Sequence, residues 1–359
     1  MTVVNDLLDQ VEVQEERQRR FYLGISGIGN SNNRLVWMRY RWLMPDDWEP
    51  RVLRLLDLGN VVEEDLIKKL RKIPGAKIYD VDKNGKQFKT KAFGGHVRGH
   101  IDGVAKDLPG LESDPYLLEF KTANENRFNK LEKLGSYCDW SEEYDAQIHL
   151  YMGLFKLSRC IVIVYNKNNS ALYTEAIDFD LQKFNMFMEK AKSILLANTP
   201  PENNIPVTDY RIRSYMTPRQ QSAYLGNSLP DKLHCRSCRF SNADIESGNW
   251  VCSKDNKIIS EKRQMTGCVN HNYIPELIPA TLIEKDEDMV LYEKDGFRFV
   301  NVPANKHSED NNFYSSEELI QVVNSGFPMD ILKKAEWIKK CLQGTIVKIK
   351  PWVETGVPF

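Results

Sequence analysis

Apolar and polar positions repeat with two different periods along the chain, and the change of period separates predicted helices from predicted strands. Between residues 50 and 73, apolar side chains recur every three or four positions, which predicts an amphipathic helix that ends before Pro74. Helices are also expected at 142–157 and 181–196, and a charged helix at 1–20.

Shorter segments follow a period of two and predict strands, with glycine, asparagine and proline marking the turns between them. Asn84-Gly85 separates the first two strands and indicates a hairpin. Because strands and helices mix along residues 20–200, this region is predicted to form one mixed α/β domain with a central sheet flanked by helices. The predicted strands are 77–81, 88–92, 97–104, 116–121, 161–165 and 172–177.

The remainder of the chain is expected to form smaller parts after a core domain over residues 1–200. Residues 201–233 are rich in proline and asparagine and indicate a linker or covering segment. Four cysteines fall within residues 234–275, which predicts a small metal-binding module. Residues 276–359 are expected to be an α+β appendage, with strands at 289–292 and 297–300 and helices near 316–324 and 328–341.

Composition narrows the class of protein without naming a function. The 359 residues carry 49 basic and 50 acidic side chains, and 42% are hydrophobic, which is typical of a soluble globular chain of two or three domains. The longest apolar run is six residues, Cys160 to Tyr165, so a membrane-spanning helix is not expected. The N-terminus lacks an apolar signal-peptide core, and seven cysteines do not indicate a disulfide framework. We therefore expect a cytoplasmic protein.

Two strands carry acidic residues that can meet at one edge of the sheet. In Gly95–Gly103 the alternation places Arg98, His100 and Asp102 on one strand face. In Leu117–Thr122 it places Glu119 and Lys121 on a common face. Two carboxylates at one edge suit a hard divalent cation, and a nearby lysine can stabilise charge on a phosphate or help to deprotonate a water.

Two predicted helices can complete this site. Glu63, on the 50–73 helix, is a third acidic ligand, and Gln147 and Tyr151 lie four residues apart on one face of the 142–157 helix. Such a pair can hydrogen-bond the lysine, a water or a phosphate. Each of these residues has an ordinary structural explanation by itself, so the ordered set carries the prediction.

In that ordered set the sequence resembles the PD-(D/E)XK nuclease superfamily, specifically its RecB-like exonuclease branch and phage-encoded members, over about residues 25–180. The resemblance implies a restriction-endonuclease-like core in which Mg²⁺ or Mn²⁺ is held by Asp102, Glu119 and the backbone carbonyl of Phe120. It implies that Lys121 is catalytic, with Gln147 and Tyr151 as the helix motif of the branch. Glu63 matches the position of an additional ligand, and His100 either supports the site or is an ordinary hydrogen-bonded strand histidine.

The same resemblance bears on the cysteines. Iron–sulfur members of this branch place a cluster cysteine just before the arginine that corresponds to Arg34, whereas Ser31-Asn32-Asn33 stand here and no cysteine precedes Cys138. A 4Fe–4S cluster is therefore disfavoured. The later cysteines favour a structural zinc site, with unrelated buried cysteines as the alternative. The expected zinc ligands are Cys235, Cys238, Cys252 and Cys268, with His271 as the substitute fourth ligand, while Cys138, Cys160 and Cys341 are expected in the core.

Aromatic and basic residues interleave in the segment Trp37–Trp42 and can stack on bases and contact phosphates. The expected DNA contacts are Arg34, Trp37, Arg39 and Arg98, although core packing by the tryptophans with exposed arginines explains the same pattern.

The sequence thus predicts a Mg²⁺- or Mn²⁺-dependent deoxyribonuclease, an exonuclease acting at DNA ends or on single strands in phage-type recombination or replication. The alternatives are a structure-selective endonuclease of the same fold and a non-catalytic DNA-binding or scaffold protein. DNA is the expected partner, and a second copy of the chain, a recombinase or a single-strand-binding protein are further partners to consider.

Overall fold

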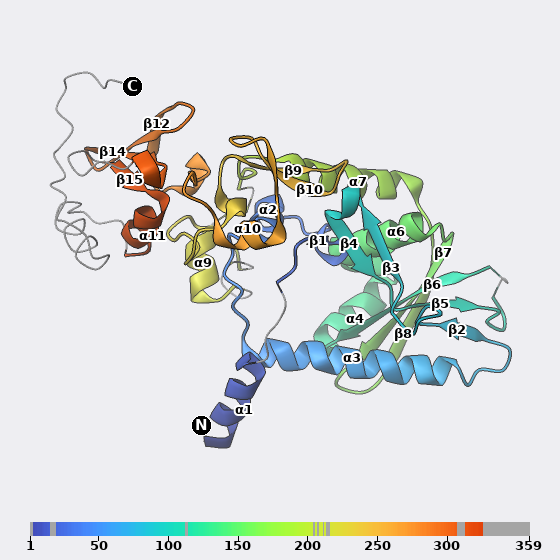
Figure 1. Cartoon of the computed structure of the whole chain (residues 1–359). Coiled ribbons are helices and arrows are strands. Elements are labelled where there is room, and N and C mark those ends of the chain that lie inside the picture. Colours follow the sequence, from blue (N-terminus) through green and yellow to red (C-terminus); the bar gives the residue numbers. More distant parts are fainter. Residues whose placement is uncertain are drawn as a thin grey trace. The chain divides into compact units, whose positions relative to one another are not determined.

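The computed structural model describes residues 3–14, 19–111, 114–203, 205–206, 208–210, 212, 216–306 and 313–325, and the chain divides into two compact units (Figure 1). The first unit comprises Met1–Ser31, Trp48–Leu195 and Ile245–Gly248. The second comprises Asn32–Asp47, Leu196–Asp244 and Asn249–Phe359. Within the described ranges, no helix combines the length and apolar character needed to cross a lipid bilayer.

A five-stranded sheet forms the centre of the first unit, in the order β2-β5-β6-β7-β8. Only β6 and β7 run parallel, and the other neighbours are antiparallel. The central strand β6 is buried over its first five residues, as expected for a strand covered on both faces. The bounds are Lys77–Tyr79 for β2, Gly103–Lys106 for β5, Tyr116–Ala123 for β6, Arg159–Asn166 for β7 and Leu172–Asp178 for β8.

Helices cover both faces of this sheet (Figure 1). The long helix α3 (Pro50–Leu70) packs through Leu66 and Ile67 against the β6 face that carries Leu118 and Phe120. The opposite face of β6 meets α6 (Glu142–Phe155), so the two helices enclose the strand that carries Glu119 and Lys121. The other helices of the unit are α1 (Val3–Gln14), α4 (Glu125–Leu134), α5 (Tyr137–Trp140) and α7 (Leu181–Leu196).

A second sheet of three strands, in the order β1-β4-β3, lies in the same unit. Its strands are β1 (Leu23–Gly24), β4 (Val97–His100) and β3 (Lys89–Ala92), with the 3₁₀ turns η1 (Ile25–Gly27) and η2 (Phe93–Gly95) between them. The predicted strand 97–104 is therefore two strands, β4 and β5, which belong to different sheets. The predicted turn at Asn84-Gly85 is present, closed by an antiparallel bridge between Val81 and Gln87 and by the hydrogen bond from Asp82 N–H to the carbonyl oxygen of Lys86. It does not extend into a longer hairpin, because β2 and β3 join different sheets.

The second unit contains two small sheets with short helices. Its three-stranded sheet has the order β11-β10-β9 and its four-stranded sheet the order β12-β13-β14-β15. Helix α2 (Asn33–Tyr40) belongs to this unit, although the sequence places it in the core domain, and α9 (Pro218–Tyr224) lies within the predicted linker. The predicted helix 328–341, with Cys341, lies outside the described residues.

In the second unit, a strand or helix is observed at most of the positions where the sequence predicts one after residue 234. The strands are β9 (Ser241–Asp244), β10 (Asn249–Cys252), β11 (Lys257–Ile259), β12 (Thr281–Lys285), β13 (Val290–Lys294), β14 (Phe297–Val302) and β15 (Phe313–Ser315). The helices and turns are η3 (Cys235–Ser237), α10 (Glu261–Thr266), η4 (Pro275–Leu277), η5 (Ala304–Lys306) and α11 (Ser316–Asn324).

Candidate active site

Asp102 lies in the short break between β4 and β5, beside the middle of β6. Its Oδ2 atom accepts a hydrogen bond from the backbone N–H of Phe120 at 2.8 Å. This position follows from the antiparallel register, in which Gly103 pairs with Leu118. Asp102 precedes Gly103 and therefore lies beside the residues that follow Leu118 on β6. The structure thus brings Asp102 next to Glu119, and it uses the N–H of Phe120 to hold the carboxylate.

Glu119, Lys121 and Gln147 form a closed set of polar contacts between β6 and α6. The Lys121 ammonium makes an ion pair with Glu119 Oε1, and the Gln147 side-chain amide donates to the same oxygen at 2.7 Å. Lys121 Nζ also donates to Gln147 Oε1 at 3.3 Å. The ring of Tyr144, which the sequence did not single out, lies with its centroid 5.1 Å from Lys121 Nζ. The Glu119 carboxylate, the Gln147 side chain and the Tyr144 ring together fix the position of the ammonium.

Burial and like charge act on the carboxylates of this site. Burial raises the pKa of Glu119 to about 8; Lys121 opposes the rise, and the negative charges of Asp102 and Glu63 add to it. Burial also raises the pKa of Asp102, against the opposing effects of Lys121 and the Phe120 N–H. Glu63, half-buried on α3, has its pKa raised to about 7, first by burial and then by Asp102. Three acidic groups thus share one ammonium, so their protonated forms are favoured when no cation is bound, and a bound cation would favour the carboxylates.

The donor set fits a hard divalent cation. Glu119 is 1% exposed, and its Oε2 atom has no hydrogen-bond partner among the described residues. A buried carboxylate oxygen without a partner is costly unless a cation or water binds it. In the described part of the chain, the oxygens of Glu63, Asp102 and Glu119 do not all lie within 4.8 Å of one another, so the three groups are neighbours and not a closed ligand set.

Tyr151 supports β4 instead of facing Lys121. Burial raises its pKa, with Glu119 and Asp102 contributing, while its hydroxyl hydrogen-bonds the backbone of His100. Its ring fills the space beside Gly99, where a Cβ atom would lie 2.6 Å from Tyr151 Cε1. The predicted hydrogen bond of the helix pair to the lysine therefore comes from Gln147 alone, and Tyr151 packs against the strand that leads to Asp102. Burial, with the positive charges of Lys89 and Arg20, lowers the pKa of His100.

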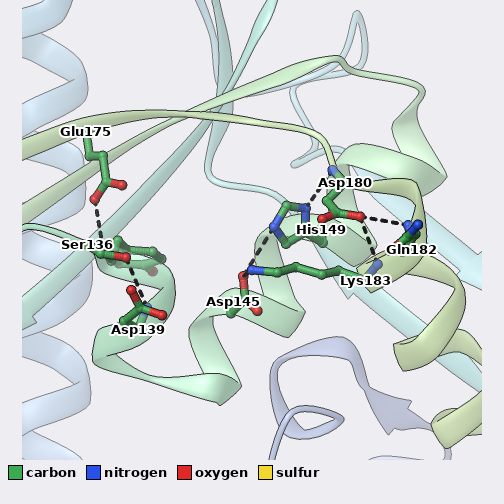
Figure 2. A network of polar contacts seen from close by, with 9 residues as sticks. Ser136, Asp139, Asp145, His149, Glu175, Asp180, Gln182 and Lys183 are labelled. Atoms are coloured by element: carbon green, nitrogen blue, oxygen red, sulfur yellow. Dashed lines mark hydrogen bonds and ion pairs between the residues drawn. The ribbon is translucent and has the colours of Figure 1, made fainter.

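The other side of α6 is tied to the start of α7 by a second polar network, shown in Figure 2. His149 Nε2 lies 3.2 Å from Asp145 Oδ1, and Lys183 Nζ lies 2.9 Å from the same oxygen. The backbone N–H of Asp180 donates to His149 Nδ1 at 3.2 Å. The Asp180 carboxylate in turn accepts from the backbone N–H groups of Gln182 and Lys183. This network fixes the helix that carries Gln147.

Cys138, Asp145 and His149 are the only group of three or more potential metal ligands in the described residues whose ligand atoms all lie within 4.8 Å. Because His149 Nδ1 accepts a backbone N–H, its Nε2 atom carries the proton and donates it to Asp145. That nitrogen then has no lone pair for a metal. Burial and a hydrogen bond to Asp145 raise the pKa of Cys138 to about 12, as expected for a neutral thiol. We therefore interpret this group as structural.

The cysteines predicted to bind zinc are neighbours in the second unit. Burial raises the pKa of Cys235 to about 12 and that of Cys238 to about 11, and the other thiols contribute to both shifts. A zinc tetrahedron with Zn–S bonds of ~2.3 Å has sulfur atoms ~3.8 Å apart. Within the described residues, no three of the sulfur atoms of Cys235, Cys238, Cys252 and Cys268 lie within 4.8 Å of one another, so the set is wider than that tetrahedron.

His271, the predicted substitute ligand, forms hydrogen bonds through one ring nitrogen, while its buried Nδ1 atom has no hydrogen-bond partner among the described residues. Its Nε2 atom lies 3.0 Å from Ser237 Oγ and 3.3 Å from the carbonyl oxygen of His234. Burial lowers the pKa of His271 to about 4, so its ring is neutral at pH 7. No metal-ligand group within the described residues includes it. The role of His271 as a substitute zinc ligand stays a prediction.

The expectation that Trp37 stacks on DNA bases is wrong. Trp37 is 0% exposed, and its indole N–H donates to the carbonyl oxygen of Ala197 at 2.8 Å. Arg41 is also buried, with its guanidinium 5.2 Å from the centroid of the Trp37 ring, and it donates to the carbonyl oxygen of Arg236. The alternation of aromatic and basic residues thus forms a buried cation–π core.

The other predicted DNA contacts differ in their exposure. Arg39 and Arg98 are exposed, whereas Arg34 is half-buried and donates to the carbonyl oxygen of Pro201 at 3.4 Å. Exposure alone does not identify a ligand for Arg39 or Arg98.

No family model and no curated protein matches the sequence. The chain is similar to several solved structures, among them SSO0001, with 13% identity and a TM-score of 0.36 over 61% of this chain and 98% of the other. An alkaline exonuclease, LHK-Exo from Laribacter hongkongensis, shows 13% identity and a TM-score of 0.34 over 53% and 90%. A phage-related exonuclease from Haemophilus somnus 129PT shows 14% identity and a TM-score of 0.24 over 38% and 66%. With TM-scores below 0.5, these likenesses do not establish a shared fold.

Proposed function

We propose that the chain is a metal-dependent deoxyribonuclease with a PD-(D/E)XK-type active site, acting as an exonuclease at DNA ends or on single strands. The observation that carries this proposal is the contact set of Glu119, Lys121 and Gln147 beside Asp102, with one Glu119 oxygen buried and unpartnered. Two carboxylates and an ammonium side by side at the central strand are the groups that phosphodiester hydrolysis with a divalent cation requires.

The residues that would hold Mg²⁺ or Mn²⁺ are Asp102 and Glu119, with Glu63 and the backbone carbonyl of Phe120 as further ligands. When bound, such a cation polarises the phosphodiester and lowers the pKa of a water that attacks it. The raised pKa values of Glu63 and Glu119 support this assignment, because a cation would relieve the repulsion among the carboxylates.

Lys121 would stabilise the negative charge that develops on the phosphate. Burial disfavours its ammonium form, yet the carboxylates of Glu119 and Asp102 outweigh burial and raise its pKa. An ammonium with a raised pKa is a poor general base, which favours charge stabilisation over deprotonation of a water. The hydrogen bond to Gln147 and the ring of Tyr144 keep the ammonium at one position, so little reorganisation is needed when the charge develops.

We also propose that Cys235, Cys238, Cys252 and Cys268 hold a structural zinc ion. Their clustering supports this proposal, and so does the positive charge around them. Arg263 hydrogen-bonds Cys268, and Arg41 interacts electrostatically with Cys238. Cationic neighbours favour thiolates, the form that binds zinc. The sulfur atoms would need to approach one another on binding.

The test of the nuclease proposal is digestion of DNA labelled at the 5′ or the 3′ end, single-stranded or duplex, with Mg²⁺, Mn²⁺ or EDTA. We expect cleavage of linear DNA with either cation and none with EDTA. Circular and end-blocked substrates separate the two enzyme modes, since an exonuclease leaves both intact whereas a structure-selective endonuclease does not. Absence of cleavage of every substrate with both cations would contradict the proposal and favour a non-catalytic DNA-binding protein.

A further inference from the structure

One face of the β1-β4-β3 sheet carries positive charge on β3 and β4. The antiparallel register pairs Lys89 with His100 and Lys91 with Arg98, so these four side chains share one face. Like charges directly opposite one another on neighbouring strands destabilise a sheet. Lys91 and Arg98 are such a pair, and Lys89 lies next to them on β3. A fold that keeps Lys91 opposite Arg98 gains no stability from this pair, which indicates that the positive charge serves a ligand.

Arg20 adds a further charge over the third strand. Gly24 of β1 pairs with Arg98 in the parallel register, and a Cβ atom on Gly24 would lie 3.3 Å from Arg20 Nη1. The Arg20 guanidinium therefore lies above β1 on the same side as Arg98. Arg98 is held in place by Tyr22, whose ring centroid lies 5.3 Å from its guanidinium carbon, and by the carbonyl oxygen of Gly95 at 2.8 Å from its Nε. We name this set, Arg20, Lys89, Lys91, Arg98 and His100, the basic face.

The opposite side of the sheet is the packed one. Val97 and Gly99 are buried, and Gly99 lies against the side chains of Tyr151 and Ile25. Lys89, Lys91 and Arg98 are exposed, and none of the three makes an ion pair with an acidic side chain of the described residues. The basic face is therefore the side on which a ligand can approach.

Protection of a sheet edge explains only part of this charge. Lysines on an exposed edge strand discourage pairing with other chains, and β3 is an edge strand. Arg98 and His100, however, lie on β4, the central strand, where no edge needs protection. Arg20, which lies above β1, is likewise not part of the edge strand β3, so edge protection does not explain its charge.

The basic face leads along β4 to the proposed active site. Arg98, His100 and Asp102 follow one another at intervals of two residues, and a strand rises ~3.3 Å per residue. Because the chain bends at Asp102, His100 lies at most about 7 Å and Arg98 at most about 14 Å from it. One DNA strand presents a phosphate for every ~3.4 Å of helix axis, so a strand that enters the site brings several phosphates within this span.

We propose that the basic face binds the sugar–phosphate backbone of the DNA strand whose scissile phosphate lies at Asp102. This inference rests on the proposed function for its ligand, and it is tested by binding without cleavage. The test measures fluorescence anisotropy of a labelled single strand and a labelled duplex in EDTA over a series of KCl concentrations. It compares the wild type with Lys89→Gln/Lys91→Gln and with Arg98→Gln.

The matched control is Lys68→Gln/Lys69→Gln on α3, which removes the same charge. Those lysines have side chains 68% and 64% exposed and pair with Glu64 and Asp65 on their own helix. Each lost phosphate contact makes the slope of log K against log salt less steep by about 0.9. At ~0.1 M salt, measured against a ~1 M reference, this change corresponds to a loss of about 8-fold in affinity. We expect the Lys89/Lys91 variant to lose up to ~60-fold in affinity and to lower the salt slope by about 2, with the control unchanged.

The inference is overturned if the Lys89/Lys91 and Arg98 variants, shown to be folded by circular dichroism, bind DNA with the wild-type affinity and salt slope. It is also overturned if the α3 control loses as much affinity as the Lys89/Lys91 variant. Failure of the proposed function gives a different result, because DNA binding that depends on the basic face would then persist in a protein that cleaves no DNA with either cation.

Discussion

At the scale of single residues, burial and charge oppose each other most strongly at Glu119. The side chain is almost fully covered, accepts from Gln147 and pairs with Lys121, yet its pKa is raised to about 8. One of its oxygens still lacks a partner in the described structure. A carboxylate in this state binds a proton when no cation is bound, and it must release that proton when a cation arrives.

This state predicts a pH dependence of stability. A carboxyl group with a raised pKa contributes stability below its unfolded-state pKa of ~4.3 and loses that contribution as the pH rises through about 8. Without added divalent cation, the free energy of unfolding should therefore fall from about pH 6 to about pH 9, by an amount on the order of a few kcal/mol. Denaturant unfolding at both pH values measures it.

Glu119→Gln supplies the comparison, because glutamine keeps the shape of the protonated side chain. Its stability should change much less over the same interval, and Mn²⁺ should stabilise the wild type more at the higher pH. Equal pH dependence in both proteins would mean that Glu119 is ionised throughout and that burial does not control it.

At the scale of elements, α6 positions the site from two sides. Gln147 contacts Glu119 and Lys121 on β6, while Asp145 and His149 bind the start of α7 (Figure 2). Tyr151, one turn further along, packs against Gly99 of β4. The helix therefore joins the strand that carries the lysine to the strand that leads to Asp102.

Gly99→Ala tests the contact between α6 and β4. The added Cβ atom would lie 2.6 Å from Tyr151 Cε1 and 2.9 Å from Ile25 Cδ1, so one of these groups must move. We expect a loss of about 1–3 kcal/mol in the free energy of unfolding and a reduced rate of DNA cleavage. Gly59→Ala is the control, since nothing lies within 4 Å of its Cβ position on α3, and it should gain up to about 1 kcal/mol.

Thermal unfolding of Gly99→Ala and Gly59→Ala measures the change in stability, and a DNA cleavage assay measures the change in rate. If Gly99→Ala is as stable and as active as the wild type, then Tyr151 does not hold β4 in the way described.

The sequence correctly predicts those helices and strands that bury one face against a single neighbouring layer, because that burial sets the period of their apolar residues. The helix expected at 181–196 is confirmed as α7, and the alternation that brings Glu119 and Lys121 to one face is observed in β6. The alternation through Arg98 and His100 is observed in β4, but Asp102 lies in a bend beyond the end of this strand. The sequence pattern does not reveal that the chain passes from one sheet to another at Asp102. Both sheets impose the same period of two, so the pattern is unbroken where the pairing changes.

Contacts without a periodic signature could not be predicted. Tyr144 approaches Lys121 through a ring face, and such a contact leaves no pattern in the sequence. Alternating tryptophan and arginine residues indicate an exposed stacking surface and a buried cation–π core equally well. The burial of Arg41 depends on carbonyl oxygens supplied by residues far along the chain, including Arg236 and Ser241.

At the scale of the whole molecule, the two units do not follow the order of the sequence. The long segment Trp48–Leu195 of the first unit ends near the predicted boundary at residue 200, but Ile245–Gly248 also belongs to this unit. The segment Asn32–Asp47 belongs to the second unit although it lies between two parts of the first. Helix α2 of this segment buries Trp37 against the carbonyl oxygen of Ala197 in the second unit. The two units are therefore joined by more than one chain crossing, and we expect neither part to be separable by a single cut.

Metal analysis tests the proposed zinc site of the second unit. The purified protein should contain about one zinc ion per chain and should lack the visible absorption of an iron–sulfur cluster. Cys252→Ser should lower the melting temperature markedly while it changes the rate of DNA cleavage little, because a closed structural site contributes folding energy. A coloured protein that contains iron and acid-labile sulfide would refute zinc, and absence of any metal would refute the site.

The central claim is that Asp102, Glu119 and Lys121 form the active site of a nuclease, and single-turnover cleavage of end-labelled DNA by Asp102→Asn and Lys121→Ala tests it most directly. Asparagine keeps an acceptor for the Phe120 N–H, and Lys121→Ala keeps the carboxylates, so both variants should stay folded. Lys69→Ala on the exposed face of α3 is the matched control. We expect both site variants to lose about 10²–10³ in rate, or ~3–4 kcal/mol of transition-state stabilisation, while the control cleaves as the wild type does. Cleavage near the wild-type rate by folded Asp102→Asn and Lys121→Ala would contradict the assignment of the site.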